Sequence, residues 1–218
     1  AKPAGGKPYE SWKLLAATRL LEAVGEDSSV RAKIAPMLAG ARAIVEDGRG
    51  ELARRLAAVH FIARATGEGG QDVERLVALL KLTTPIELQV AAVKALLRND
   101  ADATNAKSLL ARWSEHGPAL RGSILDALLS RPALTGILLD ALAGDAELAA
   151  SIDVSRRGLL LRHADEAIRK RAVVLLGGST RPDRAAVMKE YGPSLTKAGH
   201  RERGRTVFAR SCAACHQL

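Results

Sequence analysis

Cysteine occurs at only two positions in this chain of 218 residues, and both lie in one short segment. Cys212 and Cys215 are separated by two alanines, and His216 follows the second cysteine directly. Two thiols at this spacing can add across the two vinyl groups of a haem, and the adjacent histidine can then bind the iron as its proximal ligand. The segment therefore predicts covalent attachment of haem c through Cys212 and Cys215, with His216 on the iron.

The residues before this segment also fit a haem site. Gly204, Phe208 and Cys212 are spaced four apart, so in a helix they share one face, which would direct Phe208 toward the haem edge. The alternative is that Phe208 packs against the preceding helices. Only two residues follow His216, so we expect the body of a cytochrome c domain, with its distal iron ligand, outside this chain.

Two other chemistries could use the same thiols. A thiol–disulfide oxidoreductase would use Cys212 and Cys215 as a reactive pair, but such a pair normally opens a helix after a strand, and no strand pattern is present nearby. A tetrahedral zinc site could combine the two cysteines with His200 and His216, and it would need the fold to fix all four ligands. No catalytic constellation or phosphate-binding loop accompanies them.

Composition predicts the fold class of the remainder. Hydrophobic residues make up 47% of the chain and aromatic residues only 3%, which favours closely packed helices built from Ala, Leu, Val and Ile over sheets. No apolar run is long enough to span a membrane. The net charge of +9 is spread along the chain without a nucleic-acid motif or stacking aromatics, so it indicates solvated helix faces and no nucleic-acid partner. The alternative is an anion-binding patch for an acidic redox partner or an anionic surface.

A helical repeat is the organisation that the sequence predicts. The stretch 56–59 recurs as 90–93, at an offset of 34 residues, and turn signals rich in Gly, Asp and Pro separate the apolar segments. We therefore expect an all-α fold, an α-solenoid of degenerate HEAT-like helix pairs over 11–196, in which Leu96 is a core residue. Residues 1–10 are interpreted as a linker, and Pro36 is expected to kink or split a helix over 29–46.

The final residues, 197–218, are interpreted as the start of a cytochrome c domain that is truncated after the haem segment. The other candidate iron ligands are interpreted as structural. Met188 and His60 are expected in the core, His163 at a helix junction, and His116 and His200 in solvated turns.

The chain resembles the haem-containing putative membrane-bound dehydrogenases of Planctomycetes and Verrucomicrobia. The segments that carry the resemblance are 128–133, 157–165, 168–172, 191–195 and 204–216, of which only the last is chemically specific. One departure is Gly199-His200, where the family pattern has Gly-Asp, at the junction before the last helix.

The resemblance implies that a dehydrogenase-like β-propeller and the rest of a cytochrome c domain belong to the parent protein. It also implies a periplasmic or otherwise exported location and a redox partner protein. Two functions follow as hypotheses. The chain is either a helical segment of an electron-transfer protein that carries haem c, or a structural and protein-interaction solenoid with no chemistry of its own.

Overall fold

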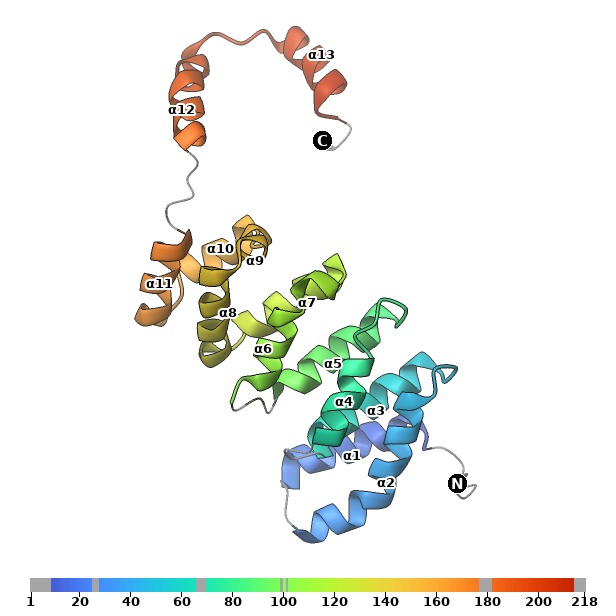
Figure 1. Cartoon of the computed structure of the whole chain (residues 1–218). Coiled ribbons are helices and arrows are strands. Elements are labelled where there is room, and N and C mark those ends of the chain that lie inside the picture. Colours follow the sequence, from blue (N-terminus) through green and yellow to red (C-terminus); the bar gives the residue numbers. More distant parts are fainter. Residues whose placement is uncertain are drawn as a thin grey trace. The chain divides into compact units, whose positions relative to one another are not determined.

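The computed structural model describes residues 9–24, 28–65, 70–98, 100, 102–176 and 182–213. Within these ranges every regular element is a helix and no strand occurs, which confirms the predicted all-α, helical-repeat fold (Figure 1). None of the described helices is both long and apolar enough to cross a membrane. The chain divides into two compact units, 1–172 and 173–218, and each is described by itself. The predicted boundary at residue 196 stays a prediction.

The first unit holds α1 to α10 and most of α11. Its α-helices are α1 Ser11–Val24, α2 Ser28–Glu46, α3 Leu52–Ala65, α4 Gly70–Ala78, α5 Ile86–Arg98, α6 Thr104–Ala111, α7 Pro118–Leu129, α8 Pro132–Gly144, α9 Ala146–Ala150, α10 Val154–Leu161 and α11 Glu166–Leu176, with a short 3-10 helix, η1, at Trp113–Glu115. The second unit contains α12 Pro182–Tyr191, the 3-10 helix η3 at Gly192–Thr196, and α13 Arg201–Ser211.

Alternate helices of the first unit form two layers. In one layer α3 packs on α1, α5 packs on α3, and α7 packs on α5. In the other layer α2 contacts α4, and α6 contacts α8. This arrangement is a stack of helix pairs, in which each pair buries its apolar face against the next one.

The sequence repeat at an offset of 34 residues corresponds to helices that occupy equivalent positions in the stack. Helices α3 and α5 begin at Leu52 and Ile86, and α4 and α6 begin at Gly70 and Thr104, so both pairs are offset by 34 residues. The equivalent segments 57–59 and 91–93, each Ala-Ala-Val, are buried in both helices. Small residues at the contact allow the two helix backbones to approach closely, which explains the low aromatic content of the core.

A recurring hydrogen bond connects successive elements of the stack. The fourth residue of five helices donates from its side chain to a main-chain carbonyl of the segment before it, where the carbonyls at a helix end lack intrahelical partners. These bonds join Arg55 to Val45 (3.0 Å), Gln89 to Thr84 (2.7 Å), Arg121 to Trp113 (3.0 Å), Thr135 to Leu128 (3.0 Å) and Arg169 to His163 (2.6 Å). They fix the register of each helix on its predecessor.

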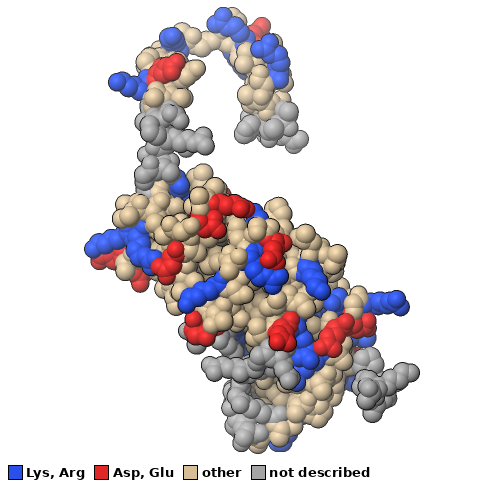
Figure 2. Space-filling model, in the orientation of Figure 1, with Lys and Arg blue, Asp and Glu red and all other residues tan. Residues whose placement is uncertain are grey.

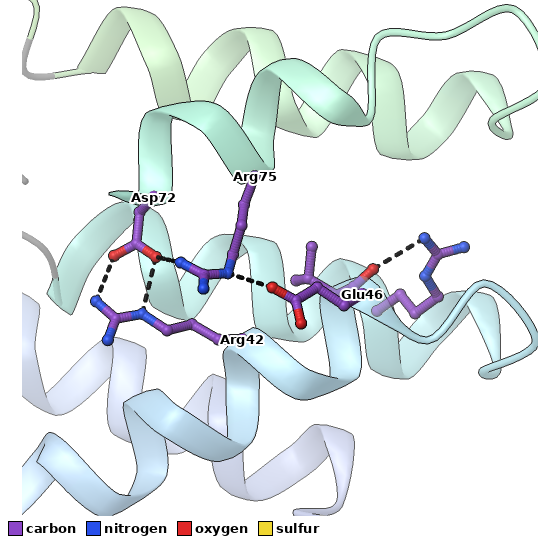
Figure 3. A network of polar contacts seen from close by, with 6 residues as sticks. Arg42, Glu46, Asp72 and Arg75 are labelled. Atoms are coloured by element: carbon purple, nitrogen blue, oxygen red, sulfur yellow. Dashed lines mark hydrogen bonds and ion pairs between the residues drawn. The ribbon is translucent and has the colours of Figure 1, made fainter. Parts of the chain in front are cut away.

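An ion-pair network connects α2 and α4 in the second layer (Figure 3). Asp72 is buried and accepts two hydrogen bonds from the Arg42 guanidinium, at 2.8 and 2.7 Å, and a third from Arg75 at 3.1 Å. Arg75 also donates to Glu46 at 2.5 Å. The hydrogen bonds with Asp72 raise the pKa of Arg42 above its ordinary value. The buried carboxylate is thus fully paired, as a charge in the interior requires.

Pro36 was expected to kink or split the helix that contains it. The helix is not split, because α2 runs from Ser28 to Glu46, and the kink stays a prediction. Proline removes the hydrogen bond to the carbonyl four residues earlier, which here belongs to Ala32. Both Pro36 and Ala32 are exposed, so water can bond that carbonyl. The helix therefore tolerates Pro36 on its solvent side.

Leu96 tests the packing of the stack. Its side chain is 4% exposed in α5, so Leu96→Ala should leave a cavity and lower the free energy of unfolding by about 2–5 kcal/mol. Leu82, which is 71% exposed, provides the control, and Leu82→Ala should change stability by less than about 0.5 kcal/mol. Chemical denaturation measures both, and equal losses in the two variants would contradict the packing described.

His116 was expected in a solvated turn, but it is buried, and its Nε2–H donates to the carbonyl of Leu109 at 3.1 Å. Burial is the main cause that lowers the pKa of His116, and the nearby Arg112 and Arg121 lower it further. The folded protein therefore binds this proton less tightly than the unfolded chain, whose histidine pKa is about 6.5. Stability is retained above that pH and falls as the pH drops below it.

We expect the free energy of unfolding to be smaller at pH 5 than at pH 7.5, with His116→Gln reducing this difference. The glutamine amide can donate to the Leu109 carbonyl without titrating. His60 on α3, whose pKa is also lowered mainly by burial, contributes in the same direction, so His60→Gln provides the comparison. A pH dependence that His116→Gln leaves unchanged would show that protonation of His116 does not limit stability.

Candidate functional site

The helix that leads into the cysteine segment is α13, Arg201–Ser211. His200 caps its N-terminus, because its Nδ1 accepts a hydrogen bond from the main-chain N–H of Arg203 at 3.4 Å. Aspartate is a common residue at the N-cap of a helix, and here the imidazole of His200 fills that role. Glu202 in the first turn and Arg210 in the last turn complement the helix dipole.

Cys212 lies at the point where α13 ends. The main-chain N–H groups of Cys212 and Ala213 both donate to the carbonyl of Phe208, at 2.8 and 2.9 Å, and this shared acceptor closes the last turn. Cys212 carries a free thiol and is half-buried. The first cysteine of the segment is therefore held in a defined position by α13.

Phe208 and Cys212 share the least exposed face of α13. All the other residues of 201–211 are exposed, Phe208 is half-buried, and no residue of the helix is buried. A Cβ atom added to Gly204, one turn earlier, would meet no other atom within 4 Å. The face that carries Phe208 and Cys212 is therefore open at Gly204. Whether Phe208 packs on a haem stays a prediction.

The remaining residues of the motif, Cys215 and His216, lie outside the described residues. Among the residues that the structure describes, no cluster of three or more His, Cys, Asp or Glu side chains could hold a metal ion. The zinc hypothesis, which combines His200 with both cysteines and His216, and the thiol–disulfide hypothesis stay untested. The accessible Cys212 thiol and the adjacent aromatic ring fit the requirements of a haem c vinyl group and ring edge.

The other candidate ligands are separate from α13 in sequence and have other surroundings. Met188 on α12 was expected in the core, but its side chain is 68% exposed. The whole of 186–191 is exposed, so this part of α12 does not contribute to a core. His60 on α3 was expected to be a partly buried core residue. Its side chain is exposed, so it is not in the core, although partial burial still lowers its pKa. His163 follows α10, where its Nδ1 accepts a hydrogen bond from the N–H of Asp165 at 3.0 Å, as expected of a helix junction.

Charge is distributed differently in the two units. On the face of the first unit drawn in Figure 2, basic and acidic side chains are interspersed, as the sequence indicates for solvated helix faces. Many of them form ion pairs between helices, such as Arg156 with Asp126 at 2.8 Å and Arg121 with Glu147 at 3.3 Å. In the second unit, α13 carries four arginines and one glutamate. The helix that leads into the cysteine segment is therefore strongly basic.

A second candidate site was missed by the sequence analysis. An open groove lies between α5 and α7 of the first unit, and Lys94, Arg98 and Arg131 are among the residues that line it. Lys94 and Arg98 are four residues apart on α5, which is the local signal that could have indicated a basic helix face. Arg131 comes from a different element, and only the fold brings it to the same groove.

Comparison with known proteins does not identify the chain. Searches against protein-family models, curated proteins and solved structures find no match. The resemblance to haem-containing dehydrogenases stays a prediction.

Proposed function

We propose that this chain is the helical-repeat segment of an electron-transfer protein that carries haem c. Cys212 and Cys215 hold the haem by thioether bonds, and His216 is the proximal iron ligand. In this proposal the parent protein belongs to the exported dehydrogenase-like family that the sequence resembles. Its β-propeller and the rest of its cytochrome c domain are the intramolecular partners of this chain.

The observation that carries the proposal is the position of the Cys-x-x-Cys-His segment directly after α13. Cys212 terminates this helix, its thiol is accessible, and Phe208 precedes it by one turn on the same face. A c-type haem needs two thiols and an imidazole at this sequence spacing, together with an apolar group beside the ring. The described residues supply one thiol and the apolar group, and the sequence supplies the other thiol and the imidazole.

Each residue has a distinct role in this proposal. Each cysteine thiol adds to one vinyl group, so that its sulfur forms a bond to one vinyl carbon and its proton goes to the other. His216 must be neutral at the nitrogen that binds iron, because a protonated nitrogen has no lone pair to donate. Phe208 excludes water from the ring edge beside Cys212. When bound, the haem iron supplies reversible one-electron transfer.

The arginines of α13 would affect the reduction potential of an attached haem and the choice of its redox partner. Arg201, Arg203, Arg205 and Arg210 place positive charge close to the attachment segment, with only Glu202 to offset it in the helix. Positive charge near a redox centre favours the electron-rich state, because it lowers the energy of the added negative charge. We therefore infer that α13 raises the reduction potential of the haem and favours an acidic redox partner.

A second candidate function is a protein-interaction solenoid without chemistry in this chain. The groove between α5 and α7 favours it, because a stacked helical repeat presents such grooves as binding surfaces. The two functions are compatible in one parent protein. They differ in whether the chain itself acquires haem.

The haem proposal is tested by producing the chain in a periplasm that contains a haem-attachment system. We expect an intact mass that exceeds the polypeptide by one haem, and a Soret absorption band that survives denaturation. Replacing both Cys212 and Cys215 by alanine should abolish attachment. His216→Ala should leave the thioethers in place but change the coordination and spectrum of the iron. Ser211→Ala, at the exposed position beside Cys212, is the control and should leave both unchanged.

The other outcomes separate the alternatives. A mass lower by two hydrogens would indicate a disulfide between Cys212 and Cys215 instead. Bound zinc that is lost in His200→Ala would favour the tetrahedral site. Because the proposal assigns only His216 to the iron, the attached haem should bind added imidazole or carbon monoxide readily. A stable six-coordinate, low-spin spectrum without added ligand would contradict that expectation and indicate Met188 or another histidine.

A further inference from the structure

The groove between α5 and α7 has the size and lining of a binding site. Its volume is about 660 Å³, within the range of roughly 300–1,000 Å³ that is typical of ligand-binding pockets. Val90 and Leu97 on α5 and Ala127 on α7 give it apolar surface. Val90 and Ala127 are half-buried, so part of their surface remains accessible to a ligand.

Three cations border this apolar surface. Lys94 and Arg98 lie one turn apart on α5, and Arg131 lies directly before α8. Arg131 donates through Nη1 to the main-chain carbonyl of Arg98 at 3.1 Å, which holds its guanidinium at the C-terminal end of α5. Within the part of the chain that the structure describes, Lys94 forms no ion pair. Arg98 approaches Glu22 at 3.9 Å, and such an exposed contact contributes little.

The groove contains one carboxylate, and its charge is already compensated. Asp126 on α7 lines the groove, and it pairs with the Arg156 guanidinium at 2.8 Å. Arg156 also donates to the carbonyl of Gly122 at 3.1 Å, so it is held in place against α7. The charge that remains available in the groove is therefore positive.

At the positions that are equivalent in the repeat, α5 carries two cationic side chains, whereas α3 carries a histidine and an arginine. Lys94 and Arg98 lie 34 residues after His60 and Arg64 on α3, at equivalent positions of the two helices. The pKa of His60 is lowered mainly by burial, and further by Lys94 and Arg98, so their field reaches the neighbouring helix. Arg64 donates to the carbonyl of Leu21 at 3.2 Å and so serves the packing of α3 on α1.

We propose that this groove binds an acidic peptide segment of a partner protein. Its carboxylates pair with Lys94, Arg98 and Arg131, and an apolar side chain of the segment lies on Val90 and Ala127. A single-stranded nucleic acid would use aromatic side chains for stacking, and none lines the groove. The site goes beyond the proposed haem function and does not depend on it.

The experiment measures binding of a fluorescein-labelled peptide of alternating glutamate and leucine to the whole chain by fluorescence anisotropy. We expect saturable binding that weakens with added salt, and no binding of the matching peptides in which glutamine or lysine replaces glutamate. Lys94→Glu should raise the dissociation constant at least about tenfold. Lys33→Glu makes the same charge change at an exposed position of α2 outside the groove and should leave binding unchanged.

A second variant of the groove, two other ligands and the chain without its cysteines complete the experiment. Arg131→Glu should weaken binding as Lys94→Glu does, with circular dichroism confirming that both variants are folded. Absence of binding, equal binding of the glutamine peptide, or equal effects of Lys94→Glu and Lys33→Glu would overturn the proposal. Tighter binding of oligouridylate or of phosphatidylserine vesicles, lost in Lys94→Glu, would assign the groove to nucleic acid or membrane instead. The chain with both cysteines replaced should bind the peptide equally, which separates this proposal from the haem proposal.

Discussion

The close stacking of α3, α5 and α7 through small residues is the interaction on which the first unit depends. No helix of such a stack can bury its apolar face alone, so each one is stable only between its neighbours. Ala57 and Ala58 on α3, with Ala91 and Ala92 on α5, are nearly or fully buried, and they keep the backbones close. The recurring side-chain bond from the fourth residue of a helix to the carbonyl end before it then determines how far each helix can slide or rotate. Together these contacts fix α5 and α7 relative to one another, and the groove lies between these two helices.

The repeat could be predicted from the sequence because it depends on short segments of similar residues, which can be recognised without knowledge of the fold. The shared Ala-Ala-Val segments at an offset of 34 correctly indicated equivalent helices, and Leu96 is buried as expected. The expectations that were wrong depended on surroundings that no local pattern contains. Pro36 does not split α2, because the carbonyl that loses its hydrogen bond belongs to Ala32, which is exposed to water. His116 follows the short 3-10 helix η1, and its buried ring bonds to the carbonyl of Leu109, seven residues earlier.

In the two candidate sites, too, some features could be predicted from a short segment of sequence and others depend on the fold. Covalent haem attachment requires three residues within one short segment, so Cys212, Cys215 and His216 could be predicted without knowledge of the fold. The capping role of His200 could not, because it follows from the extended backbone at that residue and the Nδ1 contact with Arg203. The groove could not be predicted either. Its cations come from α5 and from the segment before α8, which only the stack brings together.

Pairing determines where the net charge of +9 can act. In the first unit many arginines are committed to carboxylates, as in Arg112 with Glu115, or to main-chain carbonyls, as in Arg55. Their positive charge is largely compensated where it lies. Among the described residues, Lys94 in the groove and the arginines of α13 belong to the cations that have no carboxylate partner within ion-pair distance, as do exposed residues such as Lys81 and Lys107. Uncompensated cations attract acidic groups at long range and so accelerate association with them. Both candidate sites therefore lie where the fold leaves positive charge unpaired, and both favour partners of the same acidic character.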